Sequence, residues 1–238
     1  MKICILTGAG ISAESGIKTF RDTNGRWNDY DVTDVATPEG FHKNPQLVLD
    51  FYNSRREEVH HANPNDAHHA LAKLQNDLNH EVTLVTQNVD DLHEKAGSPR
   101  VIHMHGALRE SLCRKCGDIT DANMIMRTND VCYECNHPAL RPNIVWFGEM
   151  PYSMEYIEDK IRECDIFVSI GTSGTVYPAA GFVKTAKKKA KAHTIELNLV
   201  PTYENKLFNE HIEGPATKTV TEFFDNVING EYDYLKVC

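Results

Sequence analysis

The sequence predicts an α/β fold, a Rossmann-like parallel sheet with helices on both faces and a small second domain. Apolar, β-branched runs at 2–6, 81–86 and 165–170 alternate with segments of helical periodicity, as expected for parallel strands joined by helical crossovers. Two of these runs lead directly into glycine-rich turns at Gly8 and Gly171. A strand that ends in such a turn brings backbone N–H groups close to a phosphate in α/β folds.

Two segments interrupt the alternation of strands and helices, and we expect them to form the small domain together. They are 25–62, predicted to be partly helical, and 109–142, which contains four cysteines and little apolar sequence. The expected Rossmann-like domain therefore comprises 1–24, 63–108 and 143–238.

Composition and charge limit the functional classes. The 238 residues are 41% hydrophobic, and the formal net charge is −9. An acidic chain is not expected to bind nucleic acid, which favours a basic surface. No apolar run is long enough to cross a bilayer, and the first strand begins within two residues of the N-terminus, with no room for a signal peptide. We therefore expect a cytoplasmic protein.

The first half of the chain contains one long loop, two helices and a strand after the first glycine turn. Residues 22–40 are rich in Asn, Asp, Gly and Pro and are predicted to be a loop that serves as a lid, with Trp27 as an aromatic anchor. An Asn-Pro pair starts a predicted helix over 44–61. A second helix over 66–79, capped by the preceding asparagine, leads to the strand at 81–86.

The second half continues the alternation. The expected elements are strands over 101–104, 143–147, 165–170 and 194–199, and helices over 154–163, 178–191 and 218–229. The lysines of the helix over 178–191 are expected to form a solvated face. Cys4 and Cys164 lie in or beside apolar strands and are expected to be buried.

The first glycine turn departs from the dinucleotide fingerprint. That motif requires Gly-x-Gly-x-x-Gly, but position 13 is Ala and the next glycine is Gly16. The turn therefore predicts a phosphate loop, with a purely structural turn as the alternative. Phe20 and Arg21 favour the phosphate loop, because they add an aromatic ring and a cation just beyond the glycines.

Four of the seven cysteines form two CxxC pairs, Cys113/Cys116 and Cys132/Cys135. This separation supplies four thiolates to one tetrahedral Zn²⁺. Four protein ligands leave no open position for water, so the metal is expected to be structural and to supply folding energy. A redox role for either pair is the alternative.

Most of the twelve histidines have ordinary structural explanations. The pairs His60-His61 and His68-His69 are expected on or near exposed helix ends. His105 lies between the end of a predicted strand and Gly106, which favours a position in the crevice. His103 is its competitor, because two residues earlier on the same strand it shares a face with His105.

The sequence also resembles the sirtuins, the NAD-dependent protein lysine deacylases. In the family's order, the matching motifs are GAGISAESGIKTFR at 8–21, TQNVD at 86–90, HMHG at 103–106, the two CxxC pairs, FGE at 147–149, GTS at 171–173 and ELN at 196–198. They span nearly the whole chain. The resemblance implies the same α/β fold, with a zinc ribbon in the small domain.

The resemblance implies that NAD is consumed as a co-substrate. The acyl oxygen of a modified lysine would attack the ribose carbon that bears nicotinamide, giving an alkylimidate. His105 would be the general base that takes a proton from the ribose hydroxyl, and Asn88 would be the second catalytic residue. The products would be free lysine, nicotinamide and O-acyl-ADP-ribose.

The resemblance also implies the binding residues. Zinc would be held by the four cysteines. A peptide would be taken up as an added strand between two segments of the chain. The protein is expected to be a monomer. The implied NAD-binding residues are Gly8, Ala9, Gly10, Ser12, Thr19, Phe20, Arg21, Trp27, Gln87, Asn88, Asp90, Gly171, Thr172, Ser173, Asn198, Leu199 and Ala216. The implied peptide contacts are Phe147, Gly148, Glu149 and Val176.

Tyr52 and Arg55 lie three residues apart on a predicted helix and therefore share a face. A phenol and a guanidinium together suit a carboxylate, although a core tyrosine beside a solvated arginine is the simpler alternative. The surrounding FYNSRR resembles the sirtuin subclass that removes succinyl, malonyl and glutaryl groups. In that subclass Ala36 would match a small residue that widens the acyl pocket. Arg56 is adjacent to Arg55 but is expected to point about 100° away around the helix.

Two other functions remain open. A mono-ADP-ribosyltransferase would use the same NAD site without an acyl channel. A zinc-stabilised module that binds NAD or ADP-ribose without turnover would need no base, so His105, Asn88 and Asp90 argue against it.

Overall fold

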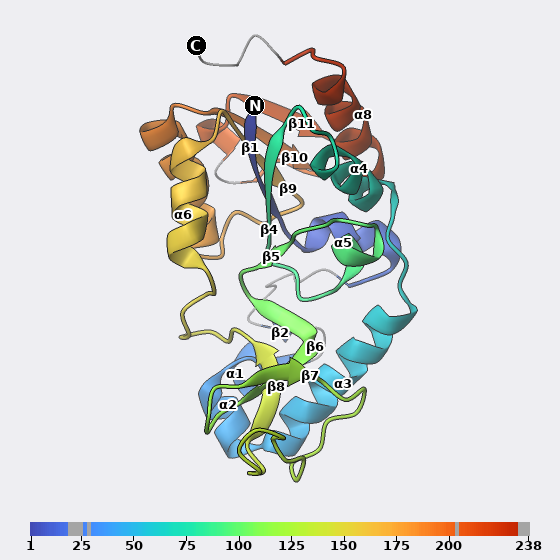
Figure 1. Ribbon diagram of the computed structural model, residues 1–238, viewed down its shortest axis with the longest axis vertical. Helices are drawn as coiled ribbons and strands as arrows, with labels where there is room; N and C mark the ends of the chain where they lie inside the picture. Colours follow the sequence, from blue (N-terminus) through green and yellow to red (C-terminus); the bar gives the residue numbers. More distant parts are fainter. Residues whose placement is uncertain (19–25, 28–29, 203–204, 233–238) are drawn as a thin grey trace.

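The computed structural model describes residues 1–18, 26–27, 30–202 and 205–232. The molecule has two parts along its long axis (Figure 1): a larger lobe around a parallel sheet, which contains the N-terminus, and a smaller lobe of short strands and helices. In the described residues no helix is both long enough and apolar enough to cross a membrane.

The large lobe is built on six parallel strands in the order β11-β10-β9-β1-β4-β5. The strands are β1 (Lys2–Thr7), β4 (Glu81–Thr86), β5 (Ile102–His103), β9 (Ile166–Ile170), β10 (His193–Asn198) and β11 (Glu210–Glu213). Numbered within the sheet, this is the Rossmann order 3-2-1-4-5-6, whose order reverses between β1 and β9. The predicted Rossmann-like fold is confirmed.

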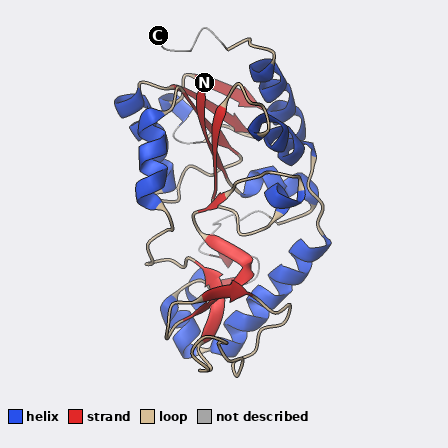
Figure 2. Ribbon diagram, in the orientation of Figure 1, coloured by secondary structure: helices blue, strands red, loops and turns tan. Residues whose placement is uncertain are grey.

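Successive side chains of β1 point alternately to the two faces of this sheet. Ile3 and Ile5 join one apolar cluster, and Cys4 and Leu6 join another on the opposite face. Helices α4 and α8 pack on the first cluster, and α6 and α7 pack on the second (Figure 2). These helices are α4 (Asp66–Gln75), α6 (Met154–Glu163), α7 (Phe182–Thr185) and α8 (Ala216–Ile228).

The small lobe combines a three-stranded antiparallel sheet with helices. The sheet has the order β7-β6-β8, with β6 (Gly106–Cys113), β7 (Ile119–Asp121) and β8 (Leu140–Ile144); the helices are α1 (Val32–Val35), α2 (Pro38–Lys43) and α3 (Pro45–His61). A two-stranded ribbon, β2 (Arg26–Trp27) and β3 (Tyr30–Asp31), lies beside them. The core of this lobe is aromatic, with Phe41, Phe51, Tyr52 and Trp146 all buried.

Short helices complete the fold. They are the 3₁₀ helices η1 (Ala9–Ser15), η2 (Ala179–Gly181) and η4 (Asn205–Leu207), the α-helix α5 (Leu92–Lys95) and the π-helix η3 (Ala186–Ala190). The helix predicted over 178–191 is therefore a succession of η2, α7 and η3.

The structure corrects the loop predicted over 22–40. Its described part contains α1 and α2, each capped by a side chain: Asp31 accepts the N–H of Thr33 at 2.9 Å, and Thr37 accepts the N–H of Gly40 at 3.0 Å. Thr37 followed by Pro38 is a helix-start signal that the sequence analysis overlooked.

The strand predicted over 143–147 is also wrong in position and partner. The observed strand, β8, ends at Ile144 and pairs antiparallel with β6. Trp146 and Phe147 leave the ladder because the Glu149 carboxylate and the Ala36 carbonyl accept their N–H groups, at 2.8 and 3.0 Å. Among the described residues, the strands β2, β3, β6, β7 and β11 were not predicted from the sequence.

Candidate active site

The two glycine turns meet where the strand order reverses. Gly8 N–H donates to the Ile170 carbonyl at 2.9 Å, and Gly10 N–H donates to the Gly171 carbonyl at 2.8 Å. A Cβ on Gly10 would lie 2.7 Å from Gly171 Cα, and Gly171 itself has φ of +60°. Only glycine fits both positions, so the turns bring predicted NAD-binding residues together at the crevice where such folds bind nucleotides.

Ser12 is the centre of a buried polar network next to these turns. Its hydroxyl donates to Asp90 Oδ2 at 3.0 Å and accepts from Asn88 Nδ2 at 3.2 Å. Burial raises the pKa of Asp90, while the Leu92 N–H and the Ser12 hydroxyl oppose that rise. Three residues assigned to the NAD site from distant motifs are therefore in direct contact.

His68 also belongs to this network, contrary to the expectation of an exposed helix end. The side chain is fully buried, with Nε2 3.4 Å from Ser12 Oγ and Nδ1 3.1 Å from Asn65 Oδ1. Burial lowers its pKa to about 4, so the ring is neutral. One signal was available: His68 lies three residues before Leu71 on the face of α4 that packs on the sheet.

His93 is a second buried histidine that the sequence analysis did not single out. Its ring lies 5.0 Å from that of His68, and its Nε2 lies 3.0 Å from Thr7 Oγ1 at the end of β1. Burial lowers its pKa well below the usual range. Two neutral imidazoles therefore lie beneath the first glycine turn.

His105 and His103 differ in the partners of their ring nitrogens. His105 Nδ1 lies 3.1 Å from the Gln87 carbonyl, which can only accept, so Nδ1 carries the hydrogen. Burial lowers the pKa of His105, so the ring is neutral and Nε2 has a free lone pair. His105 lies in the turn between β5 and β6, one residue beyond the strand predicted over 101–104.

His103 has an acceptor at each nitrogen. Nδ1 lies 3.1 Å from the Asn88 carbonyl, and Nε2 lies 2.7 Å from Glu94 Oε1. Burial lowers the pKa of His103, but the hydrogen bond and charge of Glu94 outweigh it, so the net shift is upward. A doubly protonated ring has no lone pair with which to act as a base.

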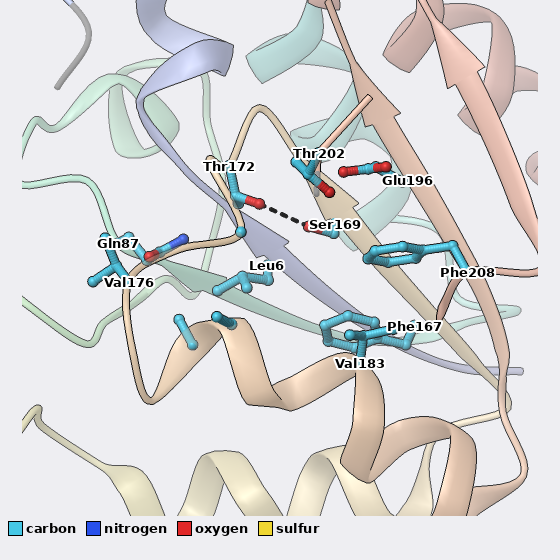
Figure 3. Close-up of a pocket in the computed structure, with 13 residues that line it drawn as sticks. Leu6, Gln87, Phe167, Ser169, Thr172, Val176, Val183, Glu196, Thr202 and Phe208 are labelled. Carbon is cyan, nitrogen blue, oxygen red and sulfur yellow. Dashed lines mark hydrogen bonds between the residues drawn. The ribbon is translucent and has the colours of Figure 1, made fainter. Parts of the chain in front are cut away.

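The remaining predicted NAD residues surround the same edge of the sheet. Gln87 and Thr172 line a pocket with Val176, a predicted peptide contact, and the Thr172 hydroxyl bonds Ser169 at 3.1 Å (Figure 3). Asn198 Nδ2 donates to the Thr172 carbonyl at 2.7 Å. Ser173 bonds Thr175, Leu199 is exposed, and Ala216 begins α8. Thr19, Phe20 and Arg21 lie outside the described residues.

Tyr52 lies deep in the small lobe, on α3. Its hydroxyl is fully buried and accepts the indole N–H of Trp146 at 3.0 Å. Burial raises its pKa, so the phenol keeps its proton at neutral pH. Trp27 packs nearby, with ring centroids 5.0 Å from Phe51 and 6.2 Å from Tyr52, so this predicted lid residue contacts the same helix.

Arg55 lies one turn further along α3. Its Nη1 pairs with Glu58 Oε2 at 2.8 Å, while its buried Nε has no acceptor in the described part of the chain. Arg56 is buried and points elsewhere, as predicted, since its Nε donates to the Leu108 carbonyl at 2.7 Å and its Nη1 donates to the Met124 carbonyl at 3.1 Å. It ties α3 to the antiparallel sheet.

The predicted peptide segment joins this region through its backbone. Phe147 N–H donates to the carbonyl of Ala36, which is buried, and the Phe147 side chain is about half exposed. The Glu149 carboxylate is engaged by Arg141 at 2.9 Å and by the Trp146 N–H, so it shapes the turn at Gly148. Ala36 and Tyr52 therefore belong to one buried cluster, and Phe147 is attached to it through its backbone.

The four predicted cysteine ligands form one cluster, with their sulfurs all within 4.8 Å of one another. Cys113 and Cys135 lie 3.6 Å apart, and Cys116 and Cys132 lie 3.7 Å apart, measured between sulfurs. A tetrahedron with Zn–S bonds of ~2.3 Å has edges of about 3.8 Å. The donor set therefore fits a closed, structural Zn²⁺ site.

The two cysteine hooks have the same backbone design. Gly117 N–H donates to the Cys113 carbonyl at 2.9 Å, and Asn136 N–H donates to the Cys132 carbonyl at 2.8 Å. Gly117 and Asn136 both have positive φ, +78° and +54°. Each turn thus aims two sulfurs at the same point.

The fold and these sites define the class: an α/β protein with a nucleotide crevice and a structural zinc site in its second lobe. The chain belongs to the Sir2 family, whose family model matches residues 8–178. The resemblance to the sirtuins is thereby confirmed.

Curated relatives match nearly the whole chain. The NAD-dependent protein deacylase of Salmonella typhimurium is 51% identical over 232 residues, which are 96% of this chain and 85% of that protein. The NAD-dependent protein deacylase of Caulobacter vibrioides is 50% identical over 232 residues, covering 96% and 97% of the two chains.

Solved structures give the same result. A Sir2 homologue in complex with NAD matches with a TM-score of 0.84 and 37% identity, over 98% of this chain and 90% of that chain. A Sir2 protein in complex with an inhibitor, 2'-O-acetyl-ADP-ribose and a deacetylated peptide matches with a TM-score of 0.77 and 28% identity, over 98% and 94%.

Removal of zinc is expected to unfold residues 109–142 and to inactivate the protein indirectly, because this segment has little apolar core of its own. Chelation followed by metal analysis and circular dichroism checks this. Cys164→Ala, a buried cysteine outside the cluster, serves as the control and should retain the metal. Active protein with well under one zinc per chain would contradict the assignment.

The buried histidines should make stability depend on pH. The folded-state pKa of His68 is lowered to about 4, so between about pH 6.5 and 4 the unfolded chain binds more protons. The free energy of unfolding should therefore fall as pH falls through this window, by up to ~1.4 kcal/mol per pH unit for one histidine. Denaturant titrations should show a shallower slope for His68→Gln; an unchanged slope would exclude His68 as a source.

Proposed function

We propose that this protein removes acyl groups from protein lysines with consumption of NAD, and that it prefers succinyl and malonyl over acetyl groups. The coarse part of the proposal, NAD-dependent protein deacylation, follows from membership of the Sir2 family and from curated relatives of that name over nearly the full length. The preference for acidic acyl groups is carried by the unpartnered donors at Tyr52 and Arg55.

NAD, when bound, supplies the electrophilic ribose carbon and the nicotinamide leaving group. Within the chain, Gly8, Gly10 and Gly171 give the close backbone approach that its phosphates need. The Ser12, Asn88 and Asp90 cluster offers buried hydroxyl, amide and carboxyl groups for the nicotinamide and ribose. Asn198 holds the second turn through the Thr172 carbonyl.

His105 is the proposed general base. Its Nδ1–H is held by the Gln87 carbonyl, which fixes the tautomer and orients Nε2 as the proton acceptor. His103 cannot take this role while both its nitrogens are engaged by acceptors. Asn88 engages His103 through its backbone carbonyl and donates its side-chain amide to Ser12, so it belongs to the cofactor crevice and contacts the competing histidine, whereas Gln87 holds the base.

The base assignment predicts that His105→Ala lowers turnover by about two to four orders of magnitude, the usual loss for a general base. NAD binding, measured by calorimetry, should remain nearly intact. His103→Ala is the matched comparison, because it removes a neighbouring histidine that is engaged at both nitrogens, and it should lower turnover much less. The reverse order of effects would mean that His103 is the base.

The proposal of an acidic acyl group rests on two buried donors. The Tyr52 oxygen accepts from Trp146, and its own hydrogen has no acceptor among the described residues. The Arg55 Nε is likewise unpaired. A carboxylate could accept both hydrogens, and such replacement donors are what a desolvated charge needs. Ala36, the small residue that the resemblance assigns to the acyl pocket, lies in the same buried cluster as Tyr52.

Arg55→Met should lower kcat/KM for succinyl-lysine peptides about ten- to a hundredfold, mostly through KM, and should affect acetyl-lysine peptides far less. The estimate comes from one charge-assisted hydrogen bond, about 1.5–3 kcal/mol. Tyr52→Phe should give the same selectivity with a smaller loss. Steady-state kinetics on both peptides measure this, and equal losses on both would show that Arg55 supports the fold or the cofactor site instead.

A mono-ADP-ribosyltransferase or a binding module without turnover are the alternatives. Incubation with NAD and a succinylated peptide separates the three, because only a deacylase gives free nicotinamide together with O-acyl-ADP-ribose. We further propose a cytoplasmic monomer that takes up its peptide as a strand along Phe147–Glu149 and Val176, with the two-domain boundaries given above.

A further inference from the structure

A hydrogen bond between the side chains of Trp146 and Tyr52 connects the antiparallel sheet of the small lobe to helix α3. Tyr52 lies on α3 and Trp146 follows β8, and the indole Nε1 lies 3.0 Å from the phenol oxygen. Both side chains are almost fully buried, at 3% and 0% exposed. Water therefore does not compete for either group.

The direction of this bond is fixed by chemistry. An indole N–H can only donate, so the phenol oxygen must be the acceptor. The phenol hydrogen must then point to a different partner. No described residue accepts it, and burial keeps it on the oxygen by raising the pKa of Tyr52.

The indole itself is held on several sides. The Arg141 guanidinium lies 4.0 Å from the indole ring centroid, and Arg141 pairs with Glu149 at 2.9 Å. The same carboxylate accepts the Trp146 backbone N–H at 2.8 Å, and the Phe41 ring lies 5.3 Å away. This packing limits rotation of the indole and keeps its N–H directed at Tyr52.

We propose that Trp146 is a positioning residue that sets acyl specificity, because its N–H occupies the Tyr52 oxygen and directs the phenol hydrogen to the carboxylate of an acidic acyl group. This inference rests on the proposed function and deepens it. Trp146 acts through Tyr52, and an acyl group without a terminal hydrogen-bond acceptor gains nothing from the arrangement.

The test compares wild type, Trp146→Phe, Tyr52→Phe and the double variant. Each is assayed with a succinyl-lysine peptide and with a pentanoyl-lysine peptide, whose neutral acyl chain has the same length and no terminal hydrogen-bond acceptor. The ratio of the two kcat/KM values is independent of the fraction of folded protein. Trp146→Phe should lower this ratio about three- to tenfold, the effect of one neutral hydrogen bond. In the Tyr52→Phe background it should cause no further loss.

Phe41→Leu is the packing control, because Phe41 touches the indole without contacting its N–H, and it should leave the ratio unchanged. If Trp146→Phe leaves the ratio unchanged while Tyr52→Phe lowers it, the positioning role is wrong and the acidic-acyl proposal stands. If Trp146→Phe lowers the ratio equally in both backgrounds, or Phe41→Leu lowers it as much, the role is only packing. If wild type itself does not distinguish the two peptides, the acidic-acyl proposal fails as well.

Discussion

The contact between two glycine turns is the constraint on which the site depends. Gly10 and Gly171 approach so closely that neither could carry a Cβ, and this contact joins the ends of β1 and β9 where the strand order reverses. The contact between the two turns also fixes the positions of the residues that follow Gly10. Ile11 accepts from Asn65 at 2.8 Å, and Ser12 is thereby placed against Asp90 and His68. Backbone packing alone therefore forms the nucleotide crevice.

The small lobe is stabilised by different interactions. Its aromatic core and the buried Arg56, which donates to backbone carbonyls of two segments, connect α3 to the antiparallel sheet. The cysteine cluster lies at one end of that sheet, since Cys113 is the last residue of β6. Zinc therefore stabilises the strand whose first residue, Gly106, follows His105. The strand β6 therefore connects a cysteine of the metal site, Cys113, to the proposed base, His105, although the metal takes no part in the proposed reaction.

Much of the fold could be predicted because its signals are local. The strand over 165–170 has a continuous apolar run, the helix over 154–163 was predicted with its observed bounds, and the CxxC spacing predicted the sulfur cluster. The contact of His68 with Ser12 and the bond between Trp146 and Tyr52 could not be predicted, because their partners lie 56 and 94 residues apart in the sequence. For the same reason the strand over 140–144 was misplaced. Its pairing with β6 depends on tertiary contacts, which the hydrophobic periodicity of the sequence does not reveal.

The central claim is that buried donors in the small lobe receive an acyl carboxylate. A crystal structure of the protein with a succinyl-lysine peptide tests it most directly. We predict carboxylate oxygens within about 3 Å of the Tyr52 hydroxyl and of the Arg55 guanidinium, with Trp146 still donating to Tyr52. A carboxylate directed into solvent, with Arg55 paired only to Glu58, would contradict the account.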